Sequence, residues 1–154
     1  MLLKDEVGLL KKVPLFAQMD PAKLKLLAFT SERMAFQPGQ VLFRQGDQGD
    51  AAYVIISGDA DVVAETSVGE VPLATVSENA IVGEIAILCD VPRTATVKAG
   101  TKIETLKIDK EHFLRLIREF PEIGIEVMRE LADRLTRTTT ELSQARNELK
   151  RLRQ

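Results

Sequence analysis

Residues 82–97 read VGEIAILCDVPRTATV, a string that joins a glycine, a run of helix formers, a proline and an arginine. Gly83 lacks a Cβ, so its backbone can come close to a ligand. Residues 84–88 favour a single short helix, whose first backbone N–H groups are unpaired and carry partial positive charge. Because such a helix start suits a phosphate oxygen, the string predicts a phosphate site.

Two charged side chains in this string have different expected partners. Pro92 fixes the backbone in front of Arg93, whose planar fork of donors can bind two phosphate oxygens at once. Glu84 would repel a phosphate, so its expected partner is a sugar hydroxyl, and a carboxylate that accepts from a ribose 2′-OH discriminates against deoxyribose. The alternative is a glycine turn with a surface Glu and a surface Arg in an ordinary jelly roll. The number of suitable residue types that the string combines at these spacings argues against that alternative.

The string resembles the phosphate-binding cassette of cyclic-nucleotide-binding domains, which runs Gly-Glu-Leu/Ile-Ala-Leu, a short spacer, then Pro-Arg-Ser/Thr/Ala-Ala-Thr. The resemblance implies that backbone N–H groups of Gly83 and Ala86 and the side chain of Arg93 bind the cyclic phosphate. It also implies that Glu84 accepts from the ribose 2′-OH. The ligand-binding residues expected in this string are Val82, Gly83, Glu84, Ile85, Ala86, Arg93, Thr94 and Ala95, of which the last two close the pocket.

Other segments extend the resemblance to about residues 8–120. They are VPLF at 13–16, LFRQGD at 42–47 and YVIISG at 53–58. Each is similar to what bacterial members of the family and kinase regulatory subunits carry at the same place in the domain.

Short segments rich in Val, Ile, Phe and Thr follow residue 30 and are separated by turn residues, which predicts strands. The eight expected strands are residues 32–36, 41–44, 52–57, 60–65, 70–76, 81–82, 94–99 and 103–108. Before them, one helix is expected to end at Pro14 and another to begin at Pro21 with Asp20 as its N-cap. The expected fold is α+β: an eight-stranded antiparallel β-roll, or jelly roll, flanked by N-terminal helices and a long C-terminal helix.

Composition limits the function classes. The 154 residues are 45% hydrophobic, enough for one domain with a core, and 21 basic against 23 acidic residues give a net charge of −2. That balance argues against nucleic acid as a default partner. No apolar run is long enough for a membrane segment, and the N-terminus lacks the features of a signal peptide, so a cytoplasmic location is expected.

Catalysis has little support. Jelly rolls include metal-dependent cupins, but His112 is the single histidine and is interpreted as a surface or packing residue, so no metal site is expected. Cys89 is interpreted as a small buried hydrophobe, with a redox role as the alternative. We therefore expect a protein that binds its ligand without turnover, with neither catalytic residues nor a cofactor beyond the cyclic nucleotide.

Asp109 is expected to cap a helix over residues 110–118, and a further helix begins after Phe120-Pro121. Its apolar positions alternate spacings of four and three residues, which is the seam of a coiled coil: Leu131, Leu135, Thr138, Leu142, Ala145, Leu149 and Leu152. The pattern predicts a homodimer through this helix. The expected domains are residues 1–121, the nucleotide-binding β-roll, and residues 122–154, the long helix that acts as lid and dimerisation segment.

The long helix also resembles the one that contacts adenine in bacterial catabolite activators, with Thr138 and Thr139 at the matching place. A Thr tolerated at a loose point of the coil is the equal alternative. Those two hydroxyls favour cAMP over cGMP, although a Thr after the phosphate-binding Arg, here Thr94, often accompanies cGMP. The chain stops at Gln154 without a helix-turn-helix, so no DNA-binding domain is expected. An unidentified downstream protein is expected to bind the helix and respond to it. The alternative function is a dimerisation module whose nucleotide pocket is vestigial.

Overall fold

The computed structural model describes residues 3–153, which form two compact units that divide between Glu119 and Phe120. The first unit holds all strands that the structure assigns within the described residues, together with the shorter helices. The second unit is a single long helix, α5 (Pro121–Leu152).

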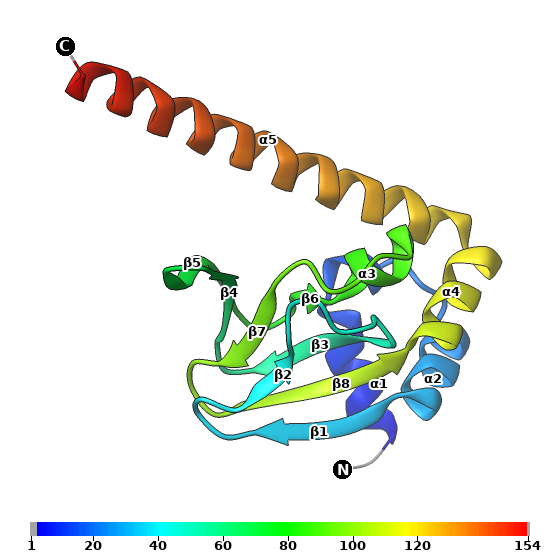
Figure 1. The fold of residues 1–154 in the computed structure, drawn as a ribbon. Coiled ribbons are helices and arrows are strands. Elements are labelled where there is room, and N and C mark those ends of the chain that lie inside the picture. The colour runs from blue at the N-terminus through cyan, green and yellow to red at the C-terminus, as the bar shows by residue number, and fades with distance from the viewer. Residues whose placement is uncertain (1–2, 154) are drawn as a thin grey trace. The chain divides into compact units, whose positions relative to one another are not determined.

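Eight antiparallel strands form two four-stranded sheets in the first unit (Figure 1). One sheet has the order β1 (Glu32–Phe36), β8 (Ile103–Asp109), β3 (Ala51–Ser57) and β6 (Ile81–Val82). The other has the order β2 (Val41–Phe43), β7 (Thr96–Ala99), β4 (Ala60–Thr66) and β5 (Gly69–Val76). The expectation of an eight-stranded antiparallel β-roll with flanking helices is confirmed.

The core lies between the two sheets because both contribute buried side chains to one cluster. Phe36, Tyr53 and Ile103 come from the first sheet, and Leu42 and Val97 come from the second. Burying an aliphatic or aromatic side chain of this size contributes about 1.5–3 kcal/mol, so this cluster supplies much of the driving force for closing the roll.

The strand expected over residues 94–99 is shorter in the structure, where β7 begins at Thr96. Residues before it leave the sheet because the backbone of Arg93 pairs with a loop instead. Gly46 N donates to Arg93 O at 2.8 Å, and Arg93 N donates to Asp47 O at 2.7 Å. The departure of the chain from the sheet at this point places Arg93 in the candidate site.

Helices α1 (Leu3–Lys11) and α2 (Pro21–Thr30) precede the roll, with a 3-10 turn, η1 (Pro14–Phe16), between them. The predicted N-cap is confirmed, since Asp20 Oδ1 accepts from Ala22 N at 3.0 Å. Helix α4 (Lys110–Glu119) follows β8 directly, and Asp109 Oδ1 accepts from His112 N at 2.9 Å as expected of a cap.

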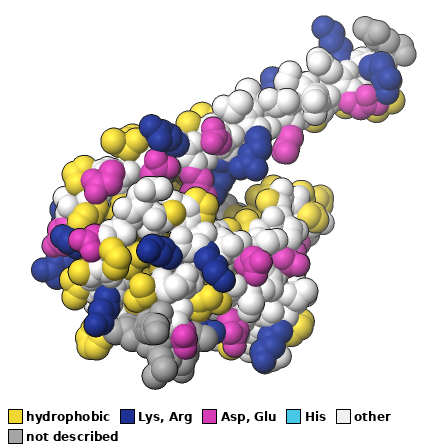
Figure 2. Space-filling model, turned by 180° about the vertical axis from the view of Figure 1, so that it is seen from behind, with side chains coloured by type: hydrophobic (Ala, Val, Ile, Leu, Met, Phe, Trp, Pro, Cys, Tyr) yellow, Lys and Arg dark blue, Asp and Glu magenta, His cyan; other side chains and the backbone are white. Residues whose placement is uncertain are grey.

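Helix α5, with 32 residues, begins after Phe120 as predicted. Four of its five predicted seam leucines are solvent-exposed in the single chain, namely Leu135, Leu142, Leu149 and Leu152, whereas Leu131 is half-buried. Despite its length, neither this helix nor any other in residues 3–153 is apolar enough to cross a membrane. On the face shown in Figure 2, basic and acidic side chains are interspersed, in keeping with the nearly balanced net charge.

Candidate functional site

Gly83 stands at the junction of β6 and helix α3 (Glu84–Cys89) with a left-handed backbone, at φ +90° and ψ 0°. Glycine adopts this conformation without steric cost. A Cβ at this position would lie 2.7 Å from Nη1 of Arg93 and 3.1 Å from Ala51 O. The position therefore requires glycine both for its backbone angle and for the close approach of Arg93.

Gly49 is a second required glycine, which was not predicted from the sequence. A Cβ there would clash with the Cβ of Ala86 in α3. The loop before β3 thus supports α3 by direct contact of backbone with side chain. The sequence does show a glycine at this place, two residues after Gly46-Asp47. The residue that it contacts, Ala86, lies 37 residues further along the chain, so the contact could not be predicted.

Arg93 is a buried cation, with 3% of its surface exposed. Its Nη1 donates to Gly83 O at 2.8 Å, and its Nη2 donates to Ala51 O at 2.7 Å. Nη2 also lies 3.5 Å from Oδ1 of Asp50, whose side chain is 77% exposed. The Nε atom is buried without a hydrogen-bond partner among residues 3–153. The guanidinium is thus held in place by backbone carbonyls and keeps donor capacity for a further acceptor.

Burial lowers the pKa of Arg93 from its ordinary value, because desolvation disfavours the charged form, and the carboxylate of Asp50 partly opposes this shift. An arginine remains charged at neutral pH even so. A desolvated cation attracts an anion more strongly than an exposed one does, because water screens it less. The electrostatics of the site therefore favour an anionic ligand at this guanidinium.

Two aromatic residues pack on or near the guanidinium of Arg93. The guanidinium carbon lies 4.0 Å from the centre of the Phe43 ring, within range of a cation–π contact. The Phe43 ring in turn stacks on Tyr53, at 6.1 Å between ring centres and 29° between planes. Neither Phe43 nor Tyr53 was predicted as a site component, because an aromatic residue in a strand is usually part of the core.

Glu84 is buried in the first turn of α3, with 3% of its surface exposed. A negative charge there is favoured by the partial positive charge of the helix start, and it also opposes the lowering of the Arg93 pKa. The structure therefore brings together Gly83, Glu84 and Arg93, the three residues on which the sequence interpretation depended.

The other expected site residues differ in exposure. Within the string, Val82, Ala86 and Ala95 are buried, Ile85 is half-buried and Thr94 is exposed. Thr138 and Thr139 belong to the second unit, where both are exposed on α5.

The interpretation of Cys89 as a buried hydrophobe is wrong. Its side chain is exposed, and it occupies the last position of α3 rather than a place beside the helix start. His112 is half-buried, in keeping with its interpretation as a surface or packing residue, and its Nδ1 lies 2.8 Å from Oδ1 of Asp109. Within residues 3–153, no cluster of His, Cys, Asp and Glu side chains has the arrangement of a metal site.

Comparison with known proteins identifies the family. Residues 33–120 match the family model of the cyclic nucleotide-binding domain. The chain belongs to this family. The cyclic nucleotide-binding domain spans the β-roll, Gly83, Glu84 and Arg93, so the resemblance expected from the sequence is confirmed.

Regulatory proteins are among the relatives of this cyclic nucleotide-binding domain. It is 35% identical over 115 residues to the cAMP-dependent protein kinase regulatory subunit of Blastocladiella emersonii, covering 74% of the chain and 28% of the relative. It is 29% identical over 140 residues to the CRP-like cAMP-activated global transcriptional regulator of Mycobacterium tuberculosis, covering 90% of the chain and 62% of the relative. The chain therefore spans less than a third of the kinase regulatory subunit and under two thirds of the transcriptional regulator.

A solved structure agrees with these relatives. The catabolite activator protein of Thermus thermophilus superposes with a TM-score of 0.75 at 30% identity, over 84% of this chain and 62% of that chain. The chain is thus a cyclic nucleotide-binding domain with the fold of these proteins.

Proposed function

We propose that this domain is a non-catalytic cAMP receptor that transmits ligand binding through its C-terminal helix. The observation that carries the proposal is the buried guanidinium of Arg93, held 2.8 Å from Gly83 O at the start of α3. A buried cation beside unpaired helix N–H groups provides two kinds of donor for one cyclic phosphate. The backbone N–H groups of Gly83 and Ala86 are the proposed second set of donors.

Glu84 is the proposed acceptor for the ribose 2′-OH. Its carboxylate is buried next to the residue that contacts Arg93, which keeps the sugar site adjacent to the phosphate site. Val82, Ile85, Thr94 and Ala95 are the proposed walls of this pocket. A buried acceptor of this kind penalises a ligand without the hydroxyl, because the carboxylate would lose a hydrogen bond.

The preference for cAMP over cGMP rests on Thr138 and Thr139 as adenine contacts. In the same stretch of α5, the hydroxyls of Thr136 and Thr140 donate to the carbonyls of Ala132 and Thr136, each at 3.0 Å. Among the described residues, Thr138 and Thr139 form no side-chain hydrogen bond of that kind, so their hydroxyls are available to a base. The names of the kinase subunit and of the transcriptional regulator specify cAMP, which supports the same ligand.

Signal transmission requires that the ligand prefer one arrangement of α5. A difference in affinity worth about 1–3 kcal/mol between two arrangements is the usual allosteric scale. The exposed leucines of α5 also support a homodimer, in which the helix pairs with that of a second chain. In this proposal residues 1–121 bind the ligand in the cytoplasm, and residues 122–154 carry the response to a downstream protein.

Isothermal titration with cAMP and with cGMP tests the proposal, after any co-purified nucleotide has been removed. Micromolar or tighter binding, with cAMP favoured, is the expected result. Incubation with cAMP should yield no 5′-AMP, and added 5′-AMP should bind more weakly than cAMP. Preference for cGMP would overturn the adenine assignment. Absence of binding would favour the alternative, a dimerisation module with a vestigial pocket, and appearance of a hydrolysis product would overturn the non-catalytic assignment.

A further inference from the structure

Strand β4 continues beyond the end of its neighbour β7. The two strands pair from Ala60 opposite Ala99 to Val63 opposite Thr96, where β7 starts. Strand β4 runs on to Thr66, so residues 64–66 have no β7 backbone opposite them. The chain that would have continued β7 turns away to place Arg93.

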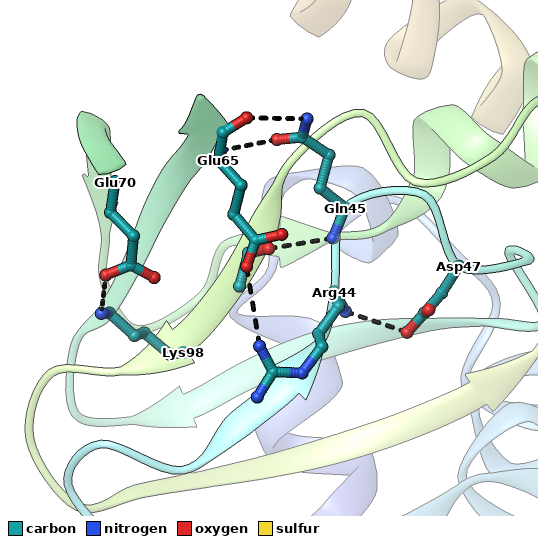
Figure 3. Close-up of polar contacts among 7 residues, drawn as sticks. Arg44, Gln45, Asp47, Glu65, Glu70 and Lys98 are labelled. Atoms are coloured by element: carbon teal, nitrogen blue, oxygen red, sulfur yellow. Dashed lines mark hydrogen bonds and ion pairs between the residues drawn. The ribbon is translucent and has the colours of Figure 1, made fainter. Parts of the chain in front are cut away.

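The side chain of Gln45 occupies this gap (Figure 3). Its Oε1 accepts from Glu65 N at 2.8 Å, and its Nε2 donates to Glu65 O at 3.3 Å. A carboxamide, like a peptide group, carries an acceptor oxygen and N–H donors in one plane. It can therefore pair with the backbone N–H and C=O of one strand residue, as a neighbouring strand would. The backbone N of Gln45 also donates to Thr96 Oγ1 at 2.9 Å, which ties the residue to the first position of β7.

The loop that carries Gln45 also holds the backbone of Arg93. Gly46 N donates to Arg93 O at 2.8 Å, and Arg93 N donates to Asp47 O at 2.7 Å. Asp47 Oδ2 accepts from Arg44 N at 3.2 Å, which closes the loop on itself (Figure 3). The loop of residues 44–47 is therefore bonded to Arg93 on one side and to β4 on the other.

Gln45 is the stronger of two links between this loop and β4. The other is an ion pair between Arg44 and Glu65, with 3.6 Å between Nη1 and Oε1. Its side chains are 61% and 39% exposed, and exposed pairs of this kind contribute little. The two hydrogen bonds from Gln45 to Glu65 are exposed as well, but both join the same two residues, which fixes direction as well as distance.

We propose that Gln45 is a positioning residue, which acts through Arg93 to strengthen binding of the cyclic phosphate. Phe43, whose ring covers the guanidinium, lies two residues before Gln45, and the backbone partners of Arg93 lie one and two residues after it. Release of Gln45 from β4 would therefore loosen both the Phe43 ring that covers the guanidinium and the loop that bonds to the backbone of Arg93. The inference rests on the proposed function, because the affinity that it concerns is affinity for a cyclic nucleotide.

The first test compares cAMP affinity in Gln45→Ala, Gln45→Glu and the matched control Gln48→Ala. Gln48 is an exposed glutamine in the neighbouring turn. Loss of two hydrogen bonds should weaken binding about tenfold in Gln45→Ala. Gln45→Glu keeps the acceptor for Glu65 N but loses the donor, so an intermediate loss is expected. Affinities in both Gln45 variants equal to that of Gln48→Ala would overturn the proposal.

A double-mutant cycle with Arg93→Lys separates positioning from a general loss of stability. If Gln45 acts through Arg93, Gln45→Ala should weaken cAMP binding less than about twofold in the Arg93→Lys background, because the fork that it positions is already gone. A full tenfold loss in both backgrounds would show that Gln45 acts elsewhere and would overturn the proposal.

A ligand-free measurement keeps this inference distinct from the proposed function. The Nε–H group of Arg93 is buried, so its NMR resonance and its hydrogen exchange report on the pose of the side chain. Gln45→Ala should shift this resonance and accelerate its exchange, whereas Gln48→Ala should leave both unchanged. An unchanged Arg93 resonance in Gln45→Ala overturns the positioning role. If the wild type binds no nucleotide while Gln45→Ala still moves the resonance, the proposed function fails but Gln45 still positions Arg93.

Discussion

The guanidinium of Arg93 is buried, stacked on Phe43 and bonded to two backbone carbonyls. Replacement by alanine should weaken cAMP binding by about 2–5 kcal/mol, the range for removing one member of a buried charge pair. Calorimetry would measure the loss, with Arg115→Ala as a control that removes an exposed arginine from α4. Undiminished affinity in Arg93→Ala would remove the basis for the phosphate site.

Glu84 provides a separate test because its proposed partner is one hydroxyl of the ligand. The wild type should bind cAMP more tightly than 2′-deoxy-cAMP by about 1.5–3 kcal/mol, the worth of a hydrogen bond to a charged group. Glu84→Ala should bind both ligands with nearly equal affinity, because the acceptor is gone. Competition titrations with the two nucleotides would measure the ratio, and a ratio that persists in the variant would assign the hydroxyl to another residue.

At the scale of elements, the sequence predicted those features that local order determines. The capping of α2 by Asp20, the start of α5 at Pro121 and the eight strands follow from residues that are neighbours in the chain. Gly83, Glu84 and Arg93 were predicted together because one continuous string carries them.

Contacts between distant segments could not be predicted in this way. Gly49 against Ala86, and Phe43 over Arg93, depend on how the sheets bring loops together. Cys89 was misassigned because hydrophobic character alone does not tell which side of a short helix faces the interior. The sequence therefore predicted the string of the candidate site but not the residues from other segments that contact it.

Helix α4 provides a test of pH dependence at its cap. A hydrogen bond from the backbone of His112 lowers the pKa of Asp109 from its ordinary value. A lowered pKa means that the charged carboxylate stabilises the folded state. This contribution is complete above the ordinary pKa, near pH 4, and is lost as pH falls through the lower folded value. Asp109→Asn should remove this part of the acid dependence, about 0.5 kcal/mol for an exposed cap.

Urea unfolding between about pH 5 and pH 2 would measure that difference. Glu111→Gln is the matched control, since it removes a carboxylate from the first turn of the same helix but leaves the cap in place. The wild type and Glu111→Gln should lose more stability on acidification than Asp109→Asn. Parallel curves for all three proteins would contradict the role of Asp109.

At the scale of the whole molecule, the exposed leucines of α5 predict that two chains associate. Leu142, at a seam position, is 53% exposed in the single chain. Leu142→Asp should abolish the dimer at micromolar concentration, because it removes about 1.5–3 kcal/mol of burial per chain and places two carboxylates in the seam. Ser143→Asp adds the same charge one position outside the seam and should leave the dimer intact. Sedimentation of the three proteins measures this, and a monomeric wild type would refute the prediction.

The charges beside the seam predict how the two helices of that dimer are oriented. With Leu142 and Leu149 at position a of the heptad, Glu141 and Glu148 occupy position g, whereas Arg146 and Arg153 occupy position e. In a parallel pair each g residue faces the e residue five positions later on the other chain, so every such Glu meets an Arg. In an antiparallel pair g faces g and e faces e, so like charges would meet. The pattern therefore favours parallel helices.

Charge reversal separates the two orientations. In a parallel dimer Glu141→Arg places an arginine against the partner's Arg146 at two symmetric sites, which should weaken association by about 1 kcal/mol, or about fivefold in Kd. Adding Arg146→Glu to the same chain restores opposite charges and should recover the wild-type Kd. In an antiparallel dimer Glu141→Arg would relieve repulsion between acidic residues and strengthen association instead. Sedimentation equilibrium at low and high salt measures both effects, and the differences should shrink as salt screens the exposed charges.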